Sequence, residues 1–359
     1  MAVTSYGVND PLAVKVWSKR LSVEVLKNTW AARFMGVSSA NVIQIKDELQ
    51  KSTGDKITYG LRMQLTGTGV LGDGALEGNE ESLTTYSDSM SLNQLRHAVR
   101  SAGRMSQQRV PFSIRDEALA GLRDWWADRL DASFFNQICG YTPQTQVQWT
   151  GLQAPTAPDN AVGTGHYLNS FNAASVQDQD ITSSYTYVLT LIDRAVERAR
   201  TLVPAIRPVR VDAKDFWVAF LHPYQVTDLR TNTATGQWLD IQKAAMAGGE
   251  IEDNPLFDGA LGVYNGAILH ADYRVTSGVN TSTGNPIATV KRAVVCGAQA
   301  AMLGFGRDNG PERYTWVEEL FDYKNELGVS AGLIFGLKKT VFNSQDFATV
   351  VTSSYASAH

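Results

Sequence analysis

The amino-acid sequence of this 359-residue chain predicts an α+β fold. After an N-terminal helical pattern comes a long hairpin pattern, two further helical patterns follow it, and most of the remaining strand patterns come after these. Because helices and strands are segregated along the chain rather than alternating, we do not expect a doubly wound parallel sheet. Hydrophobic residues make up 43% and charged residues 19%, which is typical of a globular protein that can bury a sizeable core.

Composition excludes several classes of protein. A net charge of −4 argues against a dedicated nucleic-acid binder, which would be strongly basic. No apolar run approaches the roughly 18 residues of a membrane helix, and the first residues lack a signal-peptide pattern, so we expect no membrane partner. Cys139 and Cys296 are not part of a CxxC pair, and we expect both to be reduced core residues, with a disulfide as the alternative.

The first element is an expected N-terminal arm, residues 1–52, that carries one helix. Asp10 can cap a helix that begins at Pro11. Apolar residues then recur at helical spacing, namely Val14, Trp17, Leu21 and Val25.

The residue pattern over 56–92 predicts one long hairpin with an acidic tip. Apolar residues alternate with polar ones on its outgoing strand, namely Ile57, Tyr59, Leu61, Met63 and Leu65. The tip, residues 66–82, contains five glycines and four acids but no Lys or Arg. A two-stranded ribbon is at best marginally stable alone, so we expect its apolar face to lie on a neighbouring subunit. That expectation indicates a protein that works as an assembly of several copies rather than as a solitary enzyme.

Residues 89–115 contain five arginines and no acid. If this segment is helical, the arginines at positions 96, 100 and 104 share one face. The tip and this segment could both be solvated within one chain, or they could form a complementary contact between chains that sets register. The candidate subunit-interface residues are therefore Asp73, Glu77, Glu80, Glu81, Arg96, Arg100 and Arg104.

The longest expected helix spans residues 113–140. Ser113 and Asp116 form a start that resembles a capping box, and Gly140 ends the helix. At about 1.5 Å per residue it is roughly 40 Å long, which suits the spine of the fold. Its apolar stripe consists of Ala118, Leu119, Leu122, Trp125, Trp126, Leu130, Phe134 and Ile138.

The remaining elements follow in order. Residues 141–184 are polar and lack periodicity, so we expect an exposed excursion or insertion. A second helix is expected over residues 185–203, where Pro204 ends it. A third is expected over 237–249, with a turn over 254–266 after it. Strands are expected over 209–221, 267–274, 292–296, 312–321, 332–342 and 347–352.

A glycine motif of the kind that binds dinucleotides is present but poorly placed. Gly67, Gly69 and Gly72 match GxGxxG after a predicted strand. A dinucleotide site needs a helix at this point, whereas acids follow here and would repel phosphate. We therefore expect no cofactor.

A second motif is that of the serine hydrolases. Gly328, Ser330 and Gly332 match GxSxG, which would make Ser330 the nucleophile of a hydrolase. The residues that follow predict a strand instead of a helix, and only Asp346 and His359 remain to complete a triad. We expect a turn here and no catalytic residue, with a serine hydrolase as the alternative function.

Metal and acid–base sites are not expected either. The five histidines are scattered, without the paired spacing of metal ligands. Glu318 and Glu319 would point to opposite faces of a strand, so they form a poor acid–base couple. We interpret them as solvated or inter-subunit charges.

Several segments together resemble the major capsid proteins of tailed bacteriophages, in the family typified by the phage N4 coat protein. The resemblance runs nearly end to end. It rests on GDKITYGLRMQLTGTGVLGDGALEGNEESL (54–83), LRHAVRSAGRMSQQR (95–109), FLHPYQVTDLR (220–230), NPLFDGALGVYNGAILH (254–270), AVVCGAQAAMLGFG (293–306) and DYKNELGVSAGLIFGLKK (322–339).

The resemblance implies the tailed-phage and herpesvirus major capsid fold. Its parts would be an N-terminal arm (1–52), an extended loop (53–95), a peripheral domain with its spine helix (96–205), an axial domain (206–300) and strands that return to the peripheral domain (301–359). The implied function is a coat protein whose hexamers and pentamers close into an icosahedral head around double-stranded DNA. The implied location is the virion, after assembly in the host cytoplasm.

The resemblance also bears on partners. Some related shells are cross-linked through a lysine of the extended loop, but the tip here has none, so we expect a non-covalent shell. A separate cement or decoration protein could reinforce it, and portal and scaffolding proteins are further expected partners. Contact with packaged DNA would be non-specific. A DNA-binding module that uses Arg96, Arg100 and Arg104 is a further alternative.

Overall fold

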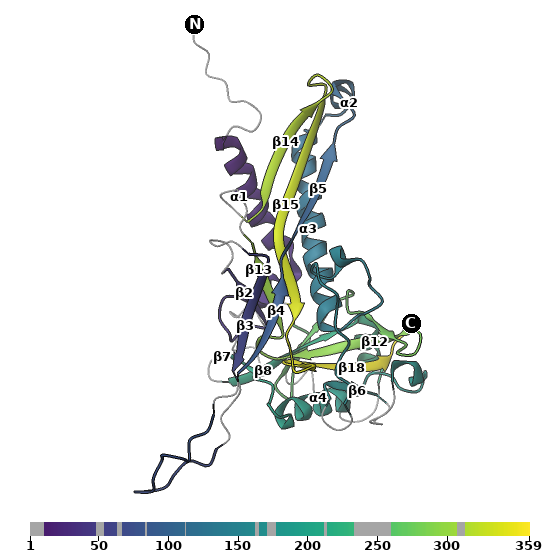
Figure 1. The fold of residues 1–359 in the computed structure, drawn as a ribbon. Helices are drawn as coiled ribbons and strands as arrows, with labels where there is room; N and C mark the ends of the chain where they lie inside the picture. The colour runs from purple at the N-terminus through teal and green to yellow at the C-terminus, as the bar shows by residue number, and fades with distance from the viewer. Residues whose placement is uncertain are drawn as a thin grey trace.

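A computed structural model of the chain describes residues 11–47, 54–62, 67–82, 85–111, 113–161, 165–170, 177–211, 214–232, 260–306 and 313–359. Helices and strands form an elongated upper part and a wider lower part (Figure 1). The predicted α+β class is confirmed. The helix expected over 237–249 lies outside the described residues, as does the first part of the expected turn at 254–266.

The upper part is built on a six-stranded sheet. Strand β15 pairs with β14 along one edge, and with β5 and then β13 along the other. Beyond β13 the order continues through β2 to β1. The strands are β1 (Met35–Gly36), β2 (Ile43–Lys46), β5 (Asn93–Arg100), β13 (Ala301–Phe305), β14 (Thr315–Phe321) and β15 (Glu326–Lys339).

Helix α3 (Ile114–Ile138) is the predicted spine helix, and it runs behind this sheet (Figure 1). It begins where Ser113 Oγ accepts a hydrogen bond from the backbone N of Asp116, as the sequence predicted. Trp126 lies on its buried face, in edge contact with Tyr314 and with Phe335 of β15. The predicted N-terminal helix α1 (Pro11–Asn28) packs on α3 and β14.

The lower part is built on an eight-stranded sheet. Strand β12 lies between β18 and β8, and β10 pairs in parallel with β8. The strands are β6 (Tyr167–Asn169), β7 (Val209–Val211), β8 (Lys214–Leu221), β9 (Gly262–Tyr264), β10 (Ala267–Ala271), β11 (Ser277–Val279), β12 (Pro286–Cys296) and β18 (Thr349–Tyr355). The helices beside it are α4 (Leu189–Thr201) and α5 (Pro223–Thr231).

The C-terminal strands divide between the two sheets. Strands β14 and β15 belong to the upper sheet, whereas β18 lies in the lower one beside β12. Helix α4 occupies the middle of the expected 185–203 helix. The peripheral and axial boundaries given above remain predictions.

The expectation of an exposed excursion or insertion over 141–184 is wrong for its second part, whereas many residues of 141–161 are exposed as expected. Strand β6 adds to the lower sheet in parallel with β18. Asp178 is only 1% exposed, and its Oδ2 lies 2.6 Å from a guanidinium nitrogen of Arg292. The segment is held by hydrogen bonds between polar groups, which leave no apolar period in the sequence.

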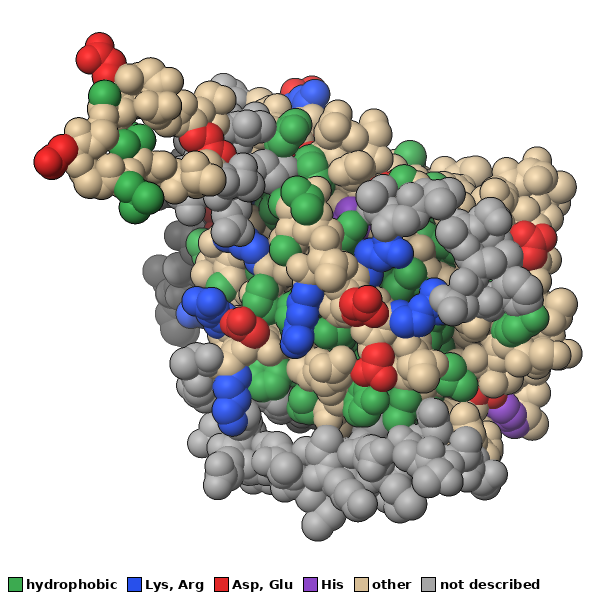
Figure 2. Space-filling view, turned by 90° about the horizontal axis from the view of Figure 1, so that it is seen from below, with side chains coloured by type: hydrophobic (Ala, Val, Ile, Leu, Met, Phe, Trp, Pro, Cys, Tyr) green, Lys and Arg blue, Asp and Glu red, His purple; other side chains and the backbone are tan. Residues whose placement is uncertain are grey.

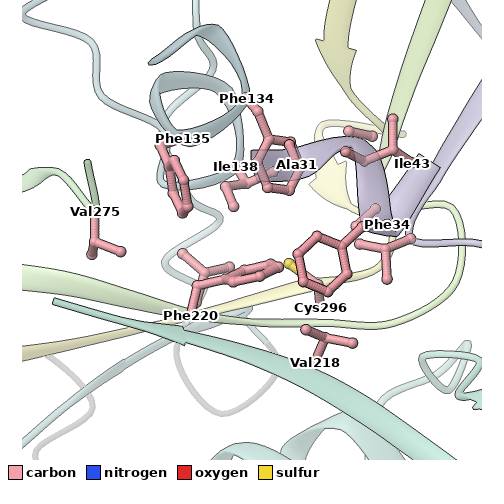
Figure 3. Close-up of a cluster of buried hydrophobic side chains, with 14 of the residues drawn as sticks. Ala31, Phe34, Ile43, Phe134, Phe135, Ile138, Val218, Phe220, Val275 and Cys296 are labelled. Atoms are coloured by element: carbon pink, nitrogen blue, oxygen red, sulfur yellow. The ribbon is translucent and has the colours of Figure 1, made fainter. Parts of the chain in front are cut away.

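The main core lies where the end of α3 meets the lower sheet. Phe220 of β8 is 0% exposed, and its ring makes edge contacts with Phe34, Phe134 and Phe135 at centroid separations of 5.1, 5.6 and 5.7 Å (Figure 3). Edge-to-face packing of this kind is favourable beyond the apolar area that it buries. Both cysteines are buried and free, as expected.

Truncating Phe220 should therefore loosen the joint between helix and sheet. We expect Phe220→Ala to lower the free energy of unfolding by about 3–5 kcal/mol, since it removes ring contacts and leaves a cavity. Denaturant unfolding of the unassembled chain measures this, with Tyr273→Ala at an exposed position as the control. A loss below about 1 kcal/mol would contradict the assignment of this core.

Candidate subunit interface

The structure contains the base of the predicted hairpin. Strands β3 (Lys56–Arg62) and β4 (Thr85–Ser91) pair antiparallel, from Lys56 opposite Ser91 to Arg62 opposite Thr85. Met63 and Leu65, which the sequence also placed on this strand, lie outside the described residues.

The apolar face of this base packs on its own chain. Ile57, Tyr59 and Leu61 are all buried in a cluster with Met302 of β13 and Phe342 of β16 (Val341–Phe342). The expectation that the ribbon base needs a neighbouring subunit is therefore wrong. Local sequence could not reveal this, because the covering residues lie more than 200 positions further along the chain.

Asp88 fastens the hairpin base to the body. Its Oδ2 accepts hydrogen bonds from the Tyr59 hydroxyl at 2.9 Å and from the backbone N of Val341 at 3.2 Å. Its Oδ1 pairs with the Lys338 ammonium, which also donates to the carbonyl of Ser89 at 3.0 Å. Burial, aided by the negative charge of Asp88, raises the pKa of Tyr59 well above its usual range, so the phenol stays a donor.

The tip of the hairpin, residues 67–82, protrudes from the body (Figures 1 and 2). Acidic side chains lie at its outer end, and Leu71 is 94% exposed. Two carboxylates order the tip locally, because Glu81 accepts from the backbone N of Gly67 at 2.6 Å and Glu80 accepts from that of Gly78 at 2.7 Å. The GxGxxG residues thus lie in an exposed loop and not at the start of a helix.

The arginine segment is a strand followed by a short helix. Arg96 and Arg100 lie on β5, opposite Gly332 and Gly328 of β15, while Arg104 begins α2 (Arg104–Arg109). The conditional expectation of one helical face is therefore wrong, since pairing with β15 selects the strand. Two of the three arginines still share a face, because residues four apart on a strand do so.

Arg100 already has partners within its own chain. Its Nε donates to Glu326 Oε2 at 2.5 Å, and its guanidinium lies over the Phe321 ring at 4.3 Å. Arg96 and Arg104 are exposed.

The acidic tip and the arginine segment lie at opposite ends of the molecule (Figure 1). The tip protrudes below the body, while α2 and the end of β5 lie at the top of the upper sheet. The two charged segments therefore do not meet within one chain, and a contact between them would join two copies.

The residues of the suspected hydrolase motif do not form a nucleophile elbow. Ser330 lies inside β15, opposite Ala98 and Val317, and its hydroxyl donates to the carbonyl of Val317 at 3.4 Å. The expected turn at this position is therefore also wrong. Asp346 pairs with Lys339, and His359 pairs with Asp228, so no triad is assembled.

The remaining suspected sites are structural. Glu318 is buried, pairs with Arg115 at 2.6 Å and accepts from Trp316 Nε1 at 2.9 Å, so its expected solvation is wrong. Glu319 is exposed on the opposite face, as the strand period predicted.

Within the described ranges no group of three or more potential ligands could hold a metal ion. No helix among the described residues is long and apolar enough to cross a membrane.

Several anchoring residues were not identified from the sequence. Asp88, Lys338 and the pairs Asp178–Arg292 and Lys339–Asp346 are buried or half-buried charges. Their partners lie far apart in sequence except for Lys339 and Asp346, so local spacing carries little signal for them.

Comparison with known proteins places this arrangement among phage shells. A family model described as phage capsid protein matches residues 5–358. The major capsid protein of Pseudomonas phage KPP25 is 28% identical over 365 residues, with 93% of each chain covered. The capsid of Ralstonia phage GP4 is 33% identical over 99% of each chain, with a TM-score of 0.80. The cyanophage Pam1 capsid shares the fold, with a TM-score of 0.69 at 19% identity over 93% of this chain and 94% of that one.

Removing the Asp88 carboxylate should detach the hairpin base. We expect Asp88→Ala to lower the local opening free energy by about 1–3 kcal/mol, because Lys338 and the Tyr59 hydroxyl lose a half-buried partner. Limited proteolysis with mass mapping should then show about tenfold faster cleavage within residues 56–91. Asp73→Ala on the exposed tip is the control, and equal cleavage of both variants would refute the anchor.

Proposed function

The chain belongs to the phage capsid protein family and is the major capsid protein of a phage, and from this we propose how copies of it assemble. It is a structural protein rather than an enzyme, with the fold of tailed-phage capsids. Many copies form hexamers and pentamers that close into an icosahedral head around double-stranded DNA. The finer membership in the N4-like group remains a prediction.

One observation carries this proposal: the hairpin is anchored at its base and exposed at its tip. The base is packed on its own chain and fastened through Asp88, and the tip protrudes from the body (Figure 1). The tip exposes Leu71 and Leu76 beside its acids, and an exposed apolar side chain gains free energy when a neighbour covers it. Modest contacts of this kind become strong when each subunit is held at several places.

We infer that the neighbour's arginine segment receives the tip. Asp73, Glu77, Glu80 and Glu81 would meet Arg96 and Arg104 of the next copy, with a smaller share from Arg100, which already pairs with Glu326. Opposite charges at such a surface set register and association rate more than affinity. The placement of the two segments at opposite ends of one molecule supports a contact between copies.

The other partners follow from the shell itself. A chain of net charge −4 suits a wall that encloses DNA, since a strongly basic inner face would hold the genome by neutralising phosphates. We therefore propose only non-specific contact with DNA. Portal and scaffolding proteins, and a separate cement or decoration protein, would join the shell during assembly in the host cytoplasm.

Charge reversal tests the contact between tip and arginine segment. We expect the double substitution Glu80→Lys and Glu81→Lys to reduce the yield of particles about tenfold, because like charges would then face each other. Circular dichroism and thermal melting should show that the fold of the variant monomer is unchanged. Combining it with Arg96→Glu and Arg104→Glu should restore part of the yield, as expected for coupled residues. Normal particles from the first variant, seen by electron microscopy, would count against the contact.

The absence of a lysine from the tip has its own consequence. We expect intact particles boiled in detergent to give a single band near the 39.2 kDa monomer, because non-covalent contacts dissociate under these conditions. A ladder of multimers on the gel would show covalent cross-links and overturn this expectation.

A further inference from the structure

Lys339 and Asp346 form a charged pair in the interior of the molecule. Lys339 is the last residue of β15, and Asp346 lies on β17 (Gln345–Asp346), which pairs with β16 in a short hairpin. Lys339 is 0% exposed and Asp346 is 1% exposed. Lys339 Nζ lies 2.6 Å from Asp346 Oδ1. An amine nitrogen and a carboxyl group are thus in contact, with solvent excluded from both.

The two side chains are poorly satisfied as ions. Although Nζ and Oδ1 are close, their geometry is not that of a hydrogen bond. No hydrogen bond from any other described residue reaches Lys339 Nζ or Asp346 Oδ2. An ammonium group has three N–H donors, and the attraction within a buried ion pair offsets the loss of hydration only when further hydrogen bonds surround the pair. The charged form is therefore an unfavourable way to bury these two groups.

The titratable side chains near the pair are kept uncharged by burial. The charges of Lys339 and Asp346 act on both His166 and Cys296, which places these groups near the pair. Burial lowers the pKa of His166 and raises the pKa of the Cys296 thiol well above its usual range. Surroundings of this kind disfavour separated charges and favour neutral products.

We propose that Lys339 and Asp346 react within one chain to form an amide bond between Nζ and Cγ. The product replaces an ammonium and a carboxylate by one neutral group, which removes the cost of burying two charges. The two groups are brought together by the fold, since the β16–β17 hairpin turns Asp346 back toward the end of β15. Contact of this kind raises the effective concentration of the amine at the carboxyl carbon.

The reaction needs no oxidant and no further reactant. One proton passes from the Lys339 ammonium to the Asp346 carboxylate, which gives an amine and a carboxylic acid. The amine lone pair attacks Cγ and forms the new C–N bond. A second proton moves from the nitrogen to a hydroxyl group of the tetrahedral carbon, the C–O bond breaks, and one water molecule leaves. The sum is ammonium plus carboxylate to amide plus water.

The bond shortens the covalent path between the two sheets. Strand β15 belongs to the upper sheet, and β18 begins at Thr349 in the lower one. The β16–β17 hairpin lies between them in sequence, and its Phe342 packs against the base of the long hairpin. An amide from Lys339 to Asp346 closes this short hairpin into a ring. A load passing from β15 to β18 then bypasses the ring, which goes beyond the proposed shell function and does not depend on it.

A tryptic digest of the unaltered chain tests the bond. Trypsin cleaves after a free lysine but not after one whose Nζ is part of an amide. No Lys or Arg follows Lys339, so we expect a C-terminal peptide of residues 339–359 that is about 18 Da lighter than its sequence requires, the mass of one water. Tandem mass spectrometry should give no fragments from cleavage inside the ring. A C-terminal peptide of residues 340–359 with its ordinary mass would overturn the proposal.

Three variants locate the lost water. Lys339→Arg and Asp346→Ala each remove one reacting group, so their C-terminal peptides should have the full mass of their sequences. Lys338→Arg keeps the pair, because Lys338 contacts Asp88 instead, and it should retain the loss of water. A loss that persists in Lys339→Arg would place the water at another group and overturn the bond. If the two pair variants do not fold, the peptide from the unaltered chain decides alone.

Discussion

The packing of α3 against both sheets is the constraint on which the rest of the structure depends. Its middle buries Trp126 against Tyr314 and Phe335 of the upper part, and its last turns bury Phe134 and Phe135 against Phe220 of the lower sheet. One helix therefore fixes the position of one sheet relative to the other. In a shell subunit this matters, because the contact surfaces must keep their relative directions for a closed container to form.

The hairpin shows how a subunit can fold alone and still carry an unfinished surface. Its base packs on Met302 and Phe342 and is held by the hydrogen bonds of Asp88, all within its own chain. The base can therefore fold without a neighbouring subunit. Its tip remains exposed with acidic and apolar side chains together. The loop between β14 and β15 is likewise held by its own chain, since Asn325 accepts from the backbone N of Arg104 and Ser101 accepts from that of Leu327. In both places a rigid base presents a surface that has no cover within the chain's described part.

Much of the fold was predictable where local patterns are strong. The hairpin, the spine helix with its Ser113 cap and the alternation of Glu318 and Glu319 are confirmed, because each follows from periodicity or capping within a few residues. The sequence-based predictions were wrong where contacts between residues far apart in the sequence determine the local structure. The arginine segment pairs with β15 more than 200 residues away, and the supposed excursion is held by an ion pair from Asp178 to Arg292. The candidate contact of tip and arginines remains untested.

The sequence by itself determined the α+β class, the long helix and an acidic ribbon tip with no basic residue, because these depend on residue type and short-range spacing. Only the tertiary structure decided that the ribbon base is covered by its own chain and that Ser330 lies inside a strand. The physical reason is that burial and strand pairing depend on which distant segments meet. Local conformational preferences do not specify those contacts, whereas the packing of the whole chain does.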